Sequence, residues 1–178
     1  RERVMAVFEW TVRNIRRTPD GWPVDDDHIL HIMIRRHGLD DQMADVFSTL
    51  STYAGVPAFW KIFEHPESGD KLVLSFANVD GAWAVFDVAR GLVFRDEQGD
   101  FADTAELAAD PELVRVATGL LSQGDVDYVP YFQSGEDLRR VTPPVAPRPL
   151  RAELQMPWPR LRHEVTQRLT RRPRNGSE

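Results

Sequence analysis

The stretch HGLDDQMADVFSTLSTYAGVPA, residues 37–58, decides the fold that we expect for this chain. Its apolar side chains recur at helical spacing and Gly55 follows them as a breaker, so the pattern predicts a helix over residues 41–54. The segment AGVPA then leads toward a buried strand. Asp40 and Asp41 stand where the helix begins, and three roles are open for them: helix capping, acid–base chemistry, or the remainder of a former site.

The bulk composition is that of one globular domain followed by a tail. The chain has 178 residues, of which 42% are hydrophobic, enough to build a real core. Its apolar runs are too short to cross a membrane, so we expect a soluble domain, either cytoplasmic or periplasmic. The sequence begins inside an expected helix. We therefore expect a fragment, and an upstream signal or anchor is left open.

The charge is distributed unevenly. Seven arginines and three glutamates follow residue 150, so this part carries +4 and residues 1–150 carry about −10 of the formal net charge of −6. An acidic body argues against nucleic acid as the main partner. The basic tail leaves docking on a membrane surface or on a protein partner open.

The complete absence of cysteine excludes several kinds of chemistry. Disulfides, thiolate metal sites and a cysteine nucleophile are all ruled out. His28 and His31 lie three residues apart after a run of aspartates, but capping explains the aspartates, and a lone histidine pair lacks the further ligands of a zinc site. We therefore expect no metal and no cofactor.

The pattern of elements predicts an α+β fold. Two amphipathic helices come first, over residues 1–17 and about residues 25–38. The helix of residues 41–54 is followed by three antiparallel strands, in VPAFWKIFE, KLVLSFANV and AWAVFDV. Asp103 and Glu106 form a capping box for a further helix, and Asp110 with Pro111 opens another.

The C-terminal part has a different character. We expect the main domain to cover residues 1–141, a proline-rich linker to cover residues 142–150, and a basic helix and tail to cover residues 151–178.

Asp87 is the most informative isolated side chain. It ends the otherwise apolar strand AWAVFDV, where a buried carboxylate needs a partner, and it can equally be a turn-forming aspartate.

The order of these motifs resembles the transglutaminase-like superfamily, whose fold is shared with papain-type cysteine enzymes. The resemblance rests on the helix that begins at Asp40, on AGVPA, on DGAW and on FDVARGLVF, and it covers residues 4–114. More narrowly, it is similar to the bacterial type found with polysaccharide or cell-envelope gene sets.

The resemblance implies a triad of which two members are missing. The cysteine position falls on Asp40, and Asp41 and Gln42 match the residues that follow it. The histidine position falls near Leu72, or on Ser75 if the strand register slips, and the aspartate position falls on Asp87. Since a triad that lacks one member loses several orders of magnitude in rate, the resemblance implies no cysteine-type catalysis.

Two functions are therefore weighed. The first is an inactive domain that binds a protein or glycan ligand in the former cleft, with Asp41, Gln42, Trp60 and Trp83 as its lining. A core position is the alternative for the two tryptophans. The second is a hydrolase of changed chemistry that uses Asp40 and Asp87 as a carboxylate pair, which must then face each other at about 5 to 9 Å.

Overall fold

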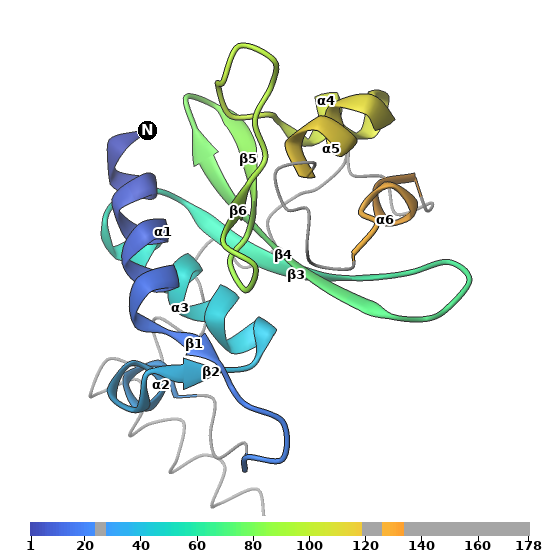
Figure 1. The fold of residues 1–178 in the computed structure, drawn as a ribbon. Helices are drawn as coiled ribbons and strands as arrows, with labels where there is room; N and C mark the ends of the chain where they lie inside the picture. The colour runs from blue at the N-terminus through green and yellow to red at the C-terminus, as the bar shows by residue number, and fades with distance from the viewer. Residues whose placement is uncertain (24–27, 119–125, 134–178) are drawn as a thin grey trace, which may run out of the picture. The chain divides into compact units, whose positions relative to one another are not determined.

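The structure is a computed structural model, and it describes residues 1–23, 28–118 and 126–133 (Figure 1). These residues belong to a compact unit that extends over Arg1–Val145. The expected linker and the expected basic helix lie outside the described residues.

Along the chain, the described elements form a mainly helical N-terminal part, then a sheet, and then a second group of helices. In chain order they are α1 (Glu2–Asn14), β1 (Arg16–Arg17), α2 (Ile29–Arg35), β2 (His37–Gly38), α3 (Asp40–Tyr53), β3 (Ala58–Glu64), β4 (Lys71–Val79), β5 (Ala82–Asp87), β6 (Leu92–Val93), α4 (Thr104–Ala109), α5 (Pro111–Thr118) and α6 (Val129–Gln133). The mixture of helices with an antiparallel sheet confirms the predicted class.

The main sheet has the strand order β3-β4-β5-β6 with antiparallel neighbours. Its first three strands are the three that alternating aromatic and branched residues predict. The short parallel pair of β1 and β2 was not expected, because two residues per strand leave no periodic pattern in a sequence.

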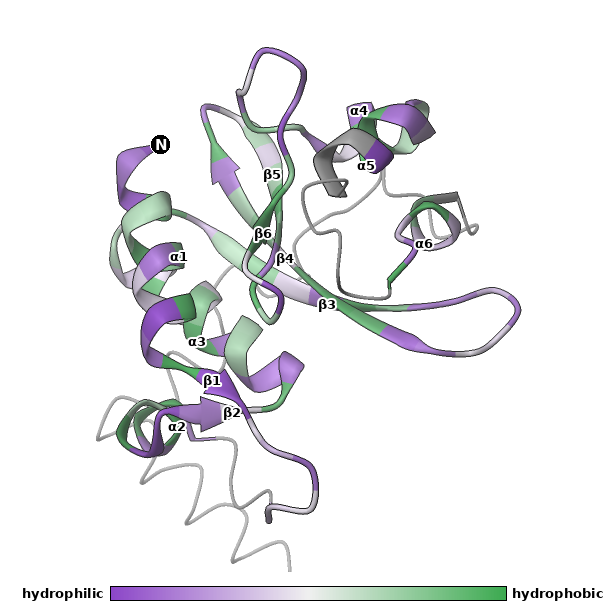
Figure 2. Ribbon diagram, in the orientation of Figure 1, coloured by the Kyte–Doolittle hydropathy of each residue, from purple (hydrophilic) through white to green (hydrophobic). Residues whose placement is uncertain are grey.

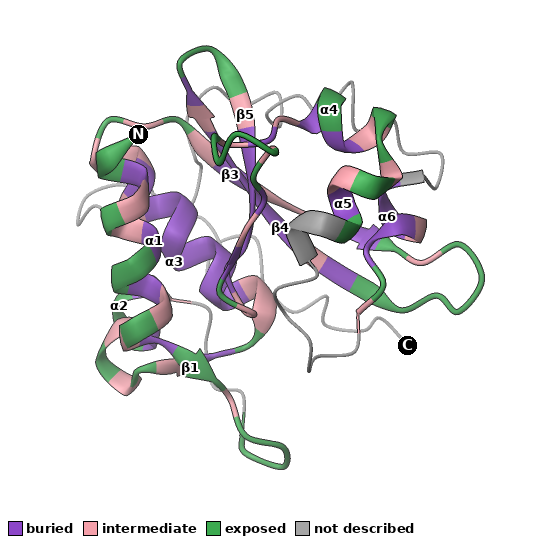
Figure 3. Ribbon diagram, turned by 45° about the horizontal axis from the view of Figure 1, so that its top comes forward, coloured by how far each residue is buried: buried purple, intermediate pink, exposed green. Residues whose placement is uncertain are grey.

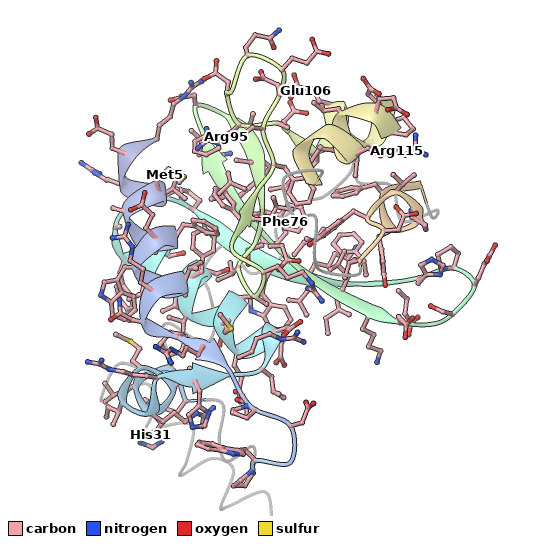
Figure 4. The ribbon with its side chains drawn as sticks, in the orientation of Figure 1. Met5, His31, Phe76, Arg95, Glu106 and Arg115 are labelled. Atoms are coloured by element: carbon pink, nitrogen blue, oxygen red, sulfur yellow. The ribbon has the colours of Figure 1, made fainter. Side chains whose placement is uncertain are left out.

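Both faces of the main sheet are covered. One face packs against α1 and α3, and α2 packs on α3, around a cluster that includes Phe8, Phe47 and Phe86. The other packs against α4, α5 and α6, around Phe76 and Phe94. Figure 1 shows the two groups of helices on opposite sides of the strands, and Figure 4 shows the Phe76 side chain among the strands.

The helix α3 is the most enclosed helix of the first group. Figure 3 shows it largely buried behind α1, and its buried residues include polar ones such as Gln42 and Asp45. Asp45 accepts a hydrogen bond from Trp60 Nε1 at 3.1 Å, which ties α3 to β3. Hydrophilic residues gather instead in the loop that joins β3 to β4 (Figure 2).

The capping box predicted for α4 is present. Asp103 Oδ1 accepts hydrogen bonds from the amides of Ala105 and Glu106, and Glu106 Oε2 accepts one from the Asp103 amide at 2.8 Å. Glu106 is labelled in Figure 4. At the start of α5, Asp110 Oδ1 likewise accepts a hydrogen bond from the amide of Glu112.

Within the described part of the chain, none of the helices has both the length and the apolar character needed to cross a bilayer.

Candidate functional site

Asp40 is the first residue of α3, and its carboxylate is held by two arginines. Arg17 Nε lies 2.7 Å from Oδ1, and Arg17 Nη2 donates to Oδ2 at 3.3 Å. Arg90 Nη1 lies 3.6 Å from Oδ2. Arg17 reaches this position because β1 runs beside β2, directly before α3. The carboxylate is therefore anchored from two distant segments of the chain.

Asp87, at the end of β5, is fully buried and has three donors. Its Oδ2 accepts hydrogen bonds from Tyr128 Oη at 2.8 Å and from Arg90 Nη1 at 2.9 Å, while Oδ1 accepts one from the Arg90 amide at 3.0 Å. Both interpretations of Asp87 are thus confirmed, since it shapes the turn after β5 and also has a charged partner.

Arg90 connects the two carboxylates through a single nitrogen. Because Nη1 lies 3.6 Å from Asp40 Oδ2 and 2.9 Å from Asp87 Oδ2, those oxygens can be no more than 6.5 Å apart, which is the sum of the two distances. The separation therefore does not exceed the upper end of the range needed by a carboxylate pair. Both carboxylates, however, pair with the same guanidinium group.

The surroundings of Tyr128 and Arg90 keep both side chains able to donate hydrogen bonds to Asp87. Burial raises the pKa of Tyr128, and the neighbouring Asp87 carboxylate raises it further. Burial lowers the pKa of Arg90, but Asp87, Tyr128 and Asp40 outweigh this and leave the pKa raised. Tyr128 therefore stays protonated and Arg90 stays charged, so Asp87 keeps both donors at neutral pH.

Asp40 and Asp41 do not act as N-caps of the helix. Leu39 is the N-cap residue, and its side chain accepts no hydrogen bond. Asp41 Oδ1 accepts one from the Gln42 amide at 2.9 Å, while Asp40 pairs with arginines. The capping interpretation is therefore wrong for Asp40, because two guanidinium groups compete successfully for its carboxylate.

Gln42 has a structural role at the start of α3. Its Oε1 accepts hydrogen bonds from the Leu39 amide at 3.0 Å and from Arg35 Nη2 at 2.7 Å, and the side chain is buried. Gly38 fits closely beside it, because a Cβ at that position would lie 3.1 Å from Gln42 Cβ. Gln42 is thus held by hydrogen bonds, and Gly38 leaves room for its side chain.

The strand register bears on the expected histidine position. Ser75 pairs with Phe86, and continuing the ladder by one step would set Leu74 opposite Asp87. Since side chains alternate between faces, Leu72 and Leu74 share the face of Asp87, whereas Ser75 points to the opposite face. Ser75, the alternative histidine position under a slipped register, therefore lies on the sheet face opposite Asp87.

The two tryptophans proposed as cleft walls lie on opposite faces of the sheet. Trp60 pairs with Ser75 and bonds to Asp45 of α3, whereas Trp83 pairs with Asn78 and packs edge-on against Phe59 at 4.9 Å. They cannot line one cleft, because alternation separates them across the sheet.

The two histidines weighed as metal ligands lie at the start of α2. The rings of His28 and His31 are 4.9 Å apart, and Figure 4 shows His31 on α2. Among the described residues, no group of three or more histidines, aspartates or glutamates is placed to hold a metal ion. The aspartates that precede His28 lie outside the described residues.

Three residues of the site were missed by sequence reasoning: Arg17, Arg90 and Tyr128. Arg17 lies at the end of the amphipathic helix predicted for residues 1–17, where an arginine indicates only an exposed face. Tyr128 lies in a segment whose sequence has no clear helical or strand periodicity. The signal for Arg90 was present, because a buried Asp87 requires a partner and the next cation follows three residues later.

Comparison with known proteins adds little to this geometry. No protein-family model matches the sequence, and no curated protein matches it. Among solved structures, a "putative cysteine protease" from Cytophaga hutchinsonii is similar, with 19% identity and a TM-score of 0.42. The match covers 58% of this chain and only 37% of that chain. At this level of similarity it supports no conclusion about activity.

Proposed function

We propose that this chain is a catalytically inactive transglutaminase-like domain that acts as a binding or scaffolding module for a protein or glycan. The observation that carries the proposal is Asp40, which stands where the resemblance requires a thiolate and is held by Arg17 and Arg90. The resemblance extends the proposal to polysaccharide or cell-envelope assembly.

The chemistry of the site supports inactivity. A carboxylate held by two cations is a poor nucleophile toward amides, and the chain has no cysteine to replace it. Asp87, which would orient a histidine, instead accepts from Tyr128 and Arg90. Leu72 and Leu74, on the face of Asp87, cannot take up a proton.

The first experiment tests for acyl transfer. The protein is incubated with a glutamine-containing peptide and a primary amine, and the products are followed by mass spectrometry. We expect no product above the rate in buffer. Product formation that depends on the protein would contradict the proposal.

A second experiment tests the assignment of position 40. The variant Asp40→Cys, combined with Leu72→His or with Leu74→His, is compared with Asp41→Cys, which places a thiol one residue further along the same helix. Because Arg17 and Arg90 face position 40, we expect faster labelling there by a thiol-reactive probe. Equal labelling of both thiols would count against the assignment.

The alternative hydrolase rests on one observation, the short separation of the Asp40 and Asp87 oxygens. It predicts hydrolysis of a model glycan or amide that disappears in both Asp40→Asn and Asp87→Asn. Absence of hydrolysis by the unmodified protein would leave the inactive domain as the better account.

A further inference from the structure

The guanidinium of Arg90 is held firmly on one side only. Its Nη1 contacts Asp87 and Asp40, and its backbone amide donates to Asp87. Within the described residues, its Nε and Nη2 make no hydrogen bond. The side chain is 21% exposed. One edge of a fixed guanidinium is therefore left unused.

This unused edge reaches solvent. The buried side-chain nitrogens and oxygens without a hydrogen-bond partner in the described part include the hydroxyls of Ser48, Ser51 and Ser75, but no nitrogen of Arg90. N–H groups that reach solvent and make no hydrogen bond, such as those of Arg90 Nε and Nη2, can donate to a ligand.

The neighbouring Arg17 adds a further donor. It uses Nε and Nη2 for Asp40, and its Nη1 makes no hydrogen bond within the described residues. Two guanidinium groups thus converge on Asp40 from different segments and both retain N–H groups. The groups of this cluster that make no hydrogen bond are N–H donors, so the cluster suits a ligand with acceptor oxygens.

We propose that the Nε and Nη2 edge of Arg90 is a subsite for the carboxylate of a ligand. The two parallel N–H groups on this edge match the two oxygens of a carboxylate in a bidentate arrangement. The contacts of Nη1 with Asp87 and Asp40 hold the guanidinium in place before a ligand arrives, which lowers the entropic cost of binding. The inference rests on the proposed binding function and names the ligand chemistry of that site.

The local charge balance sets the expected strength. Arg17 and Arg90 are matched by Asp40 and Asp87, so the cluster has no net charge to attract an anion from a distance. Recognition then depends on the geometry of the donors. We therefore expect weak binding of a lone carboxylate, in the millimolar range, and stronger binding only when the rest of a ligand adds contacts.

The test uses sodium acetate and the intact chain. The side-chain Nε–H signals of the arginines are followed by NMR during an acetate titration, with sodium chloride at equal ionic strength as the reference. We expect a saturable shift of the Arg90 signal with acetate alone. The exposed Arg36 signal serves as the internal control and should not saturate. Shifts of equal size in acetate and chloride would overturn the proposal.

Two variants sharpen the result. Arg90→Lys keeps the charge but removes the bidentate edge, and we expect at least a tenfold loss in acetate affinity, which corresponds to about 1.4 kcal/mol. Asp40→Asn removes a carboxylate next to Arg90, so we expect tighter binding. Unchanged affinity in both variants would overturn the subsite.

Failure of the subsite and failure of the proposed function are distinguishable. The same samples are assayed for acyl transfer with the glutamine-containing peptide and the primary amine. Turnover contradicts the inactive domain whatever acetate does, whereas the absence of a saturable shift contradicts the carboxylate subsite alone.

Discussion

Replacing Arg90 by methionine should destabilise the protein strongly. Methionine keeps much of the apolar stem but leaves Asp87, which is fully buried, without its cation at 2.9 Å. Breaking a buried ion pair costs about 3 to 5 kcal/mol. Asp87 keeps the Tyr128 hydroxyl and the amide of residue 90, so we expect about 3 kcal/mol, the lower end of the range.

The assay is urea unfolding at pH 7, followed by tryptophan fluorescence. Arg13→Met is the matched control, because Arg13 forms only an exposed pair with Glu9 and should change the free energy of unfolding by no more than about 0.5 kcal/mol. The double variant Arg90→Met with Asp87→Asn should be more stable than Arg90→Met alone, since no buried charge remains. A cost below about 1 kcal/mol for Arg90→Met, or no relief in the double variant, would refute the reasoning.

Three further changes follow from the same structure. Burial and Asp87 raise the pKa of Tyr128, so its proton is retained in the folded state where an unfolded tyrosine, with a pKa of about 10, releases it. The free energy of unfolding should therefore fall as pH rises above about 10, and fall less in Tyr128→Phe, as measured by urea unfolding from pH 8 to 11. Gly38→Ala should cost about 1 to 3 kcal/mol in the same assay, because the new Cβ would lie 3.1 Å from Gln42 Cβ. Asp103→Ala should cost about 1 kcal/mol by removing a helix cap with two amide hydrogen bonds.

Each of these changes has an outcome that would contradict it. Parallel pH profiles for Tyr128→Phe and the unmodified protein would mean that Tyr128 does not retain its proton as argued. An unchanged midpoint in Gly38→Ala would show that Gln42 shifts at little cost. For Asp103→Ala, a loss no larger than that of Glu97→Ala, in the exposed loop before α4, would remove the capping argument.

Much of the fold could be predicted because its signals are local. The helix α3 and the strands β3, β4 and β5 follow from apolar periodicity and from turn residues. The capping box of α4 follows from two residues three apart. The pair of β1 and β2 could not be foreseen, since its four residues are stabilised by backbone pairing between segments 21 residues apart.

The site was predictable only in part, for a related reason. Asp87 was identified because a carboxylate at the end of an apolar strand is a local anomaly. Its partner Tyr128 lies 41 residues away in a segment without clear periodicity, and Arg17 meets Asp40 across 23 residues. Such contacts depend on the assembled fold, so a single sequence offers no pattern for them. Trp60 and Trp83 do not line one cleft as expected, because residue type alone does not tell which face of the sheet each tryptophan occupies.

The position of Arg90 also has a consequence for the rate at which the protein unfolds. Asp87 and Arg90 are only three residues apart, but Asp40 of α3 and Tyr128, the residue before α6, join them from distant segments. Those two contacts can form only after the segments have been brought together. Interactions of long sequence separation that form after the folding barrier slow unfolding and leave the folding rate almost unchanged. The contacts of Asp40 and Tyr128 with the Asp87–Arg90 pair would then lengthen the lifetime of the native state.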